Sequence, residues 1–135
     1  MTASPRAREL VNVAALAADS KQAEDLVALD VSGPLPLTDV FLIATGRNER
    51  NVVAIAGEIE DKMLEAGAKT LRREGRAEGR WILLDFGDVI VHVFHEDDRM
   101  YYSLERLWKD CPTITLNVAS AAESVETEPA TEAAE

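Results

Sequence analysis

The feature that most constrains the fold is a pair of apolar segments separated by a short turn. Residues 80–86 read R-W-I-L-L-D-F and residues 88–94 read D-V-I-V-H-V-F, with Gly87 between them. Both segments are rich in the branched and aromatic residues that strands favour, and glycine accepts the backbone angles of a tight turn. We therefore predict a β-hairpin whose strands meet at Gly87.

Successive side chains of a strand point to opposite sides of its sheet. In the first strand of this hairpin, Trp81 and Asp85 should share one side, and Leu84 and Phe86 the other. Because both sides carry large apolar groups, either helices cover the sheet on both sides or a partner covers one of them.

Most of the aromatic residues lie in one stretch, from Gly79 to residue 108. Aromatic side chains supply large contact areas in cores and in interfaces. These aromatic side chains could simply fill the core, or some of them could form part of an interface. The acidic residues that lie among them favour the interface. Six of the seven aromatic residues belong to this stretch: Trp81, Phe86, Phe94, Tyr101, Tyr102 and Trp108.

The rest of the chain predicts further strands and three helices. Apolar residues recur at helical spacing, and capping residues such as Ser4, Asn48 and Gly67 mark helix ends. The segment 39–45 is almost continuously apolar, which indicates a strand buried on both faces. The expected order is α-β-β-α-β-β-β-α, a mixed β-sheet packed with helices in the α/β (α+β) class. We expect helices at about 5–19, 48–67 and 98–109, and strands at 25–31, 39–45 and 69–74 (an edge strand) beside the hairpin.

The domain organisation follows from length and composition. The chain has 135 residues, 47% of them apolar, which suits one globular domain. Residues 118–135 contain five glutamates and neither an aromatic nor a basic residue. We predict a domain at residues 1–117 and a disordered acidic tail at 118–135.

The charge is strongly acidic, with 14 basic and 25 acidic residues and a formal net charge of −11. This excess disfavours broad contact with nucleic acid or anionic lipid and favours a basic protein partner, although it can also serve solubility alone. Cys111 is the only cysteine, which suits a reducing compartment. With no apolar signal or membrane-spanning segment in the sequence, we expect a cytoplasmic protein.

Candidate catalytic residues are few. Asp85-Phe86-Gly87 spells the metal-binding tripeptide of protein kinases, but the other kinase motifs are missing. Asp85 and Asp88 could converge on metal ions for nucleotidyl transfer. The Gly-Ser phosphate loop and the Asp-x-Asp strand of that chemistry are missing as well, so we predict no catalytic residue, metal or cofactor and keep such an enzyme as the alternative.

The two histidines do not form a metal site by spacing. His92 and His95 are three residues apart, which places them on opposite faces of a strand. With a single distant cysteine they lack a zinc ligand set. We expect His92 in the core or on a sheet face and His95 on the surface.

The hairpin, together with Tyr102-x-Leu104-Glu105-x-Leu107-Trp108, resembles the ribosomal silencing factor family, also called Iojap. Three further features match this family: the Leu29-Asp30-Val31 segment, the strand from Asp39 to Gly46, and Arg50. The resemblance covers about residues 7–110. It implies a fold similar to that of nucleotidyltransferases, without their catalytic residues.

The resemblance also implies a function. Proteins of this family bind the large ribosomal subunit through its fourteenth ribosomal protein. They block joining of the small subunit and so repress translation when nutrients are scarce. Family members are often homodimers when free, and related organelle proteins act in large-subunit assembly, which stays open as an alternative.

The family's contacts with the ribosomal protein match Trp81 and Phe86 most directly, and Asp85, Asp88 and Tyr102 less directly. Phe86 stands where some relatives have leucine, so the apolar group is kept but its shape differs.

Overall fold

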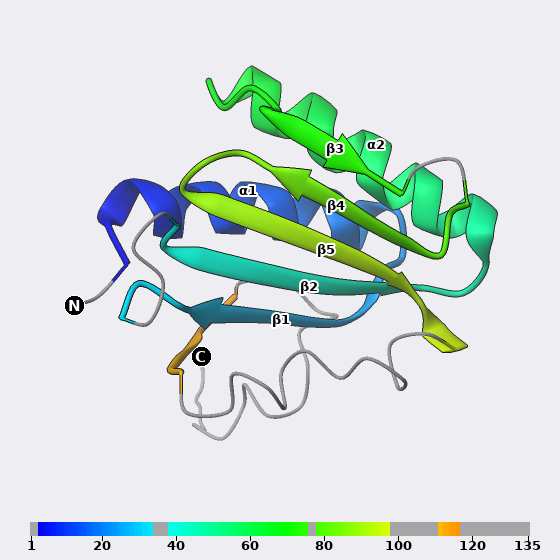
Figure 1. Ribbon diagram of the computed structural model, residues 1–135, viewed down its shortest axis with the longest axis horizontal. Coiled ribbons are helices and arrows are strands. Elements are labelled where there is room, and N and C mark those ends of the chain that lie inside the picture. The colour runs from blue at the N-terminus through cyan, green and yellow to red at the C-terminus, as the bar shows by residue number, and fades with distance from the viewer. Residues whose placement is uncertain (1–2, 34–37, 76–77, 98–110, 117–135) are drawn as a thin grey trace.

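The computed structural model describes residues 3–33, 38–75, 78–97 and 111–116. These residues form two helices and six strands in one mixed sheet, so the predicted mixed α/β class is confirmed (Figure 1). The helices are α1 (Pro5–Ser20) and α2 (Glu49–Glu65), and the strands are β1 (Glu24–Asp30), β2 (Val40–Gly46), β3 (Arg72–Glu74), β4 (Trp81–Asp85), β5 (Val89–His95) and β6 (Thr113–Ile114).

The strands lie in the order β3-β4-β5-β2-β1-β6. The central pair β2 and β5 is parallel and the other neighbours are antiparallel. The short strand β3 lies at an edge, as predicted, and β2 is buried along its whole length.

The sequence did not predict β6, which has two residues and pairs with Ala28 and Leu29 of β1. A strand this short is too brief to show the alternation by which strands are found. The helix predicted at about 98–109 and the tail predicted at 118–135 lie outside the described residues.

Both described helices pack on the same side of the sheet (Figure 1). Alanines line the buried side of α1, and branched residues such as Val52, Ile55 and Ile59 line that of α2. From the sheet, Ile82 and Leu84 of β4 are buried in this core and share one face of the strand, as the alternation predicted. The main core therefore lies between the helices and one face of the sheet.

The helix ends follow the sequence. The Ser4 hydroxyl oxygen accepts the N–H of Ala7 at 3.1 Å, and the side-chain oxygen of Asn48 accepts the N–H of Asn51 at 2.8 Å. Gly67 follows α2 with a φ of +91°, a left-handed conformation that glycine adopts without strain. The predicted caps are confirmed.

Asp30, which ends β1, and Asp39, which precedes β2, hold the start of α1. Asp30 Oδ2 accepts the N–H of Ala3 at 2.8 Å, and Asp39 Oδ2 accepts the N–H of Ser4 at 2.9 Å. Asp30 is buried, and its other oxygen accepts the Ser32 hydroxyl at 2.6 Å. Burial alone would raise the pKa of Asp30, but the bonds from Ser32 and Ala3 outweigh it and hold the pKa below its usual value.

Candidate functional site

The second face of the sheet, opposite the two helices, carries a cluster of aromatic rings. Trp81 of β4 stacks on Phe94 of β5, with ring centroids 4.9 Å apart and planes at 29°. Phe41 of β2 meets His92 of β5 edge-on at 5.0 Å. Phe41 and Phe94 are buried, whereas Trp81 is half-buried. We call these four residues the aromatic face.

A hydrogen bond joins Trp81 to His92 within the aromatic face. The indole Nε1–H donates to His92 Nδ1 at 3.2 Å. Because Nδ1 accepts, the proton of the neutral imidazole is on Nε2. This buried Nε2 has no hydrogen-bond partner among the described residues. Burial lowers the pKa of His92 to about 4, so the ring is uncharged at neutral pH.

His95 is buried, and its predicted place on the surface was wrong. It ends β5 with its side chain against the start of α2, where Nε2 lies 4.0 Å from a carboxylate oxygen of Glu49. Its Nδ1 accepts the N–H of Asp97 at 3.1 Å. The sequence shows the strand but not which helix end meets it. Among the described residues, no group of three or more His, Cys, Asp or Glu side chains could hold a metal ion.

Asp85, one of the two aspartates that could have formed a metal pair, makes a hydrogen bond within the hairpin turn. Asp85 Oδ1 accepts the N–H of Gly87 at 2.8 Å, and Phe86 donates its N–H to the carbonyl of Val89 at 2.9 Å. Gly87 has a φ of +93°, and Asp88 is exposed beside it. The Asp85 carboxylate therefore stabilises the turn.

The structure brings some predicted site residues together and separates others. Trp81 and Asp85 share one face of β4, roughly 13 Å apart along the strand. Phe86 is 7% exposed and belongs to the core under the helices, because alternation directs it away from Trp81. Asp88 lies at the turn, and Tyr102 lies outside the described residues.

Sequence reasoning missed Phe41 and the role of His92 in this site. Phe41 comes from a separate strand, and only the parallel pairing of β2 with β5 brings it beside His92. The apolar strand at 39–45 was predicted, but its neighbour in the sheet was not. Knowledge of the strand order would have identified both residues.

The fold and this site define a small α/β protein that has helices on one face of its sheet and an aromatic face on the other. None of the described helices is long and apolar enough to cross a membrane. Comparison with known proteins specifies the family.

Residues 4–135 match the family described as "Ribosomal silencing factor during starvation". The ribosomal silencing factor of Bacillus subtilis is 47% identical over 110 residues, which cover 82% of this chain and 93% of the relative. A crystal structure from Bacillus halodurans has a TM-score of 0.71 at 47% identity, covering 80% of this chain and 98% of the other. A second, from Chromobacterium violaceum, has a TM-score of 0.73 at 34% identity and covers 84% and 93%. The chain belongs to the ribosomal silencing factor family.

Proposed function

We propose that this protein silences translation by binding the large ribosomal subunit and blocking its association with the small subunit. The observation that carries the proposal is the family match over residues 4–135, since the family is described as a ribosomal silencing factor. The binding partner in this proposal is a basic ribosomal protein, the fourteenth of the large subunit, and the binding surface includes Trp81, the half-buried residue of the aromatic face.

The aromatic face has the chemistry of a protein-binding surface. Trp81 is half-buried, so part of its indole is available to a partner, and its ring is fixed by Phe94 and His92. Tryptophan is enriched among the interface residues that carry most of the binding free energy. An indole that is already ordered loses little side-chain entropy on binding.

Charge favours a basic partner for the hairpin. Asp85 lies on the same face as Trp81, and Asp88 is exposed at the turn. Within a chain of net charge −11, these carboxylates repel phosphate groups and attract lysine and arginine. The proposed contact is therefore with ribosomal protein and not with ribosomal RNA.

Phe86 has an indirect role in this proposal, and Tyr102 is a proposed contact. Phe86 supports the turn from within the core, so it shapes the surface that Asp85 and Asp88 present. Tyr102 remains a proposed contact on the strength of the sequence resemblance alone.

The proposed mechanism is steric and needs no chemical step. A domain bound at the joining surface excludes the small subunit for as long as it stays bound. The fraction of blocked subunits then depends on the protein concentration relative to Kd. Repression should rise and fall with the amount of protein in the cell.

Co-sedimentation with purified large subunits tests this function. The wild-type protein should pellet with large subunits, stay in solution with small subunits, and reduce the yield of joined ribosomes when it is added before the small subunit. A wild-type protein that leaves subunit joining unchanged at saturating concentration would contradict the proposal.

A further inference from the structure

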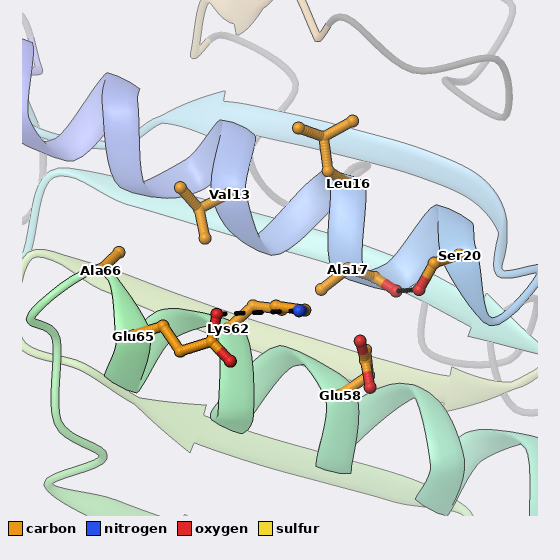
Figure 2. A pocket seen from close by; sticks show the side chains of 8 residues that line it. All are labelled: Val13, Leu16, Ala17, Ser20, Glu58, Lys62, Glu65 and Ala66. Atoms are coloured by element: carbon orange, nitrogen blue, oxygen red, sulfur yellow. Dashed lines mark hydrogen bonds and ion pairs between the residues drawn. The ribbon is translucent and has the colours of Figure 1, made fainter.

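A groove lies between α1 and α2, on the helical side of the molecule and away from the aromatic face. Its volume is about 570 Å³, and both helices contribute to its lining (Figure 2). We propose that this groove binds a basic amphipathic segment of a protein partner. The proposal does not depend on ribosome binding, because it concerns the other side of the sheet.

The groove has an apolar wall on α1. Val13, Leu16 and Ala17 line it from this helix, and Figure 2 shows Val13 and Ala17 on the side that faces α2, with Leu16 at the outer rim. Leu16 is 55% exposed, whereas Leu10, six residues before it, is 4% exposed. Leu16 does not belong to the buried core cluster and leaves an apolar surface available to a partner.

The opposite wall, on α2, carries Glu58, Lys62 and Glu65, two acidic residues and one basic residue. Glu58 and Glu65 both line the groove, and their spacing of seven positions along the helix separates them by about 10 Å. Lys62 lies between them and pairs with Glu65 at 3.7 Å. Glu58 is only partly exposed and has no ion-pair partner among the described residues. A partly desolvated carboxylate favours a cation more strongly than an exposed one does.

These two walls specify the occupant. An amphipathic helix in a groove places its apolar side chains on one wall and its polar ones on the other. Apolar residues of the partner would contact Leu16 and Ala17, and a lysine or arginine would pair with Glu58. The chain's own residues 117–135 carry five glutamates and no basic residue, so the groove repels them.

The test uses the full-length protein labelled with ¹⁵N and a helical peptide of about 14 residues, long enough to pass both glutamates. The probe peptide has leucines on one face and lysines on the other, and a second peptide has glutamates in place of the lysines. We expect the lysine peptide to shift the backbone resonances of Val13, Leu16, Ala17 and Glu58, and the glutamate peptide to shift none of them.

Two substitutions and two matched controls locate the binding. Leu16→Glu and Glu58→Lys should each weaken the lysine peptide about tenfold, because the first removes the apolar contact and the second places like charges together. The controls are Leu64→Glu, at a leucine that is 63% exposed on α2 outside the groove, and Asp61→Lys. Both controls should bind within about twofold of the wild type.

Four results would overturn the proposal. The first is shifts confined to the aromatic face, and the second is equal binding of the two peptides. The third is equal weakening by Leu16→Glu and Leu64→Glu. The fourth is evidence that another occupant fills the groove. Peptide-induced shifts in residues 117–135 would assign the groove to the tail. A wild-type dimer that Leu16→Glu dissociates would assign it to a second copy.

Discussion

The indole nitrogen of Trp81 lies 3.2 Å from Nδ1 of His92, and this hydrogen bond joins a half-buried residue of the sheet's second face to a buried one. Trp81 is half-buried, and His92 is 6% exposed. The bond requires an uncharged imidazole, because a protonated ring has no free lone pair on Nδ1. The orientation of Trp81 is therefore linked to the protonation of a buried histidine.

This link predicts a pH dependence of stability. Burial lowers the pKa of His92 from 6.5 to about 4, so the folded state favours the neutral ring. Its contribution is complete above pH 6.5 and is lost as the pH falls towards 4, a change of about 3 kcal/mol in the free energy of unfolding. Urea unfolding at pH 7, 5.5 and 4.5 measures it.

The control for this titration is His92→Asn, which keeps a hydrogen-bond acceptor for the Trp81 indole but does not ionise in this range. The variant should be less stable than the wild type at pH 7, and the difference should shrink towards pH 4.5. A difference that stays constant over this range would show that His92 does not titrate with unfolding.

A second prediction concerns the start of α1. Asp30→Asn should lower the free energy of unfolding by about 2 kcal/mol at pH 7, because a charged acceptor of three hydrogen bonds becomes neutral. The pKa of Asp30 is lowered, so the wild type's advantage exists above the usual value of 3.8 and is lost as the pH falls below it.

Asp61→Asn is the matched control for Asp30, since Asp61 is exposed on α2. It should change the free energy of unfolding by less than about 0.5 kcal/mol. Hydrogen exchange in residues 3–8 should accelerate in Asp30→Asn alone. Unchanged exchange there would mean that Asp30 does not fix the start of the helix.

A third prediction separates two glycines. Gly75 has a φ of +86°, and a Cβ on it would lie 2.0 Å from the carbonyl oxygen of Trp81. Gly75→Ala should therefore destabilise the fold by at least about 2 kcal/mol and displace the strand that carries Trp81. Gly57→Ala should stabilise it by about 0.5–1 kcal/mol, since Gly57 is inside α2 and a Cβ there meets nothing within 4 Å.

Thermal or urea unfolding of the two variants gives opposite signs if this account holds. Equal effects at both positions would mean that the close approach of Gly75 to Trp81 does not constrain the hairpin.

A fourth prediction concerns charge at the hairpin. Asparagine at position 85 keeps the acceptor that Gly87 uses, so Asp85→Asn with Asp88→Asn should change stability by less than about 0.5 kcal/mol. Association with large subunits should slow several-fold and depend less on salt, because the steering charges are gone. Stopped-flow measurements at two salt concentrations test this.

A variant of equal net charge controls for the overall field. Glu58→Gln with Asp61→Asn removes two charges from α2, on the other side of the molecule. If both double variants slow association equally, the net charge and not the hairpin steers the encounter.

The sequence predicted the helices and strands of this fold better than it predicted which of them lie side by side. The alternation in residues 81–86 identified which side chains share a face of the sheet, and Ser4, Asn48 and Gly67 identified helix ends. These features depend on local spacing and local hydrogen bonds. The strand β6 was missed because its two residues are held only by pairing with β1.

The site was predicted in part for the same reason. Trp81 and Asp85 were correctly placed on one face of their strand, since this follows from a period of two. Phe41 was missed and His95 was misplaced, because their surroundings depend on which strand or helix end lies beside them. Such neighbours are set by the sheet order, which local patterns do not specify.

The central claim is that the aromatic face binds the large subunit through Trp81, and the affinity of Trp81→Ala tests it most directly. The matched control is Leu64→Ala, which truncates a leucine that is 63% exposed on α2. We predict that Trp81→Ala raises the Kd for purified large subunits at least about 30-fold, a loss of about 2 kcal/mol, while Leu64→Ala stays within about twofold of the wild type. A folded Trp81→Ala variant that binds large subunits as tightly as the wild type would contradict the claim.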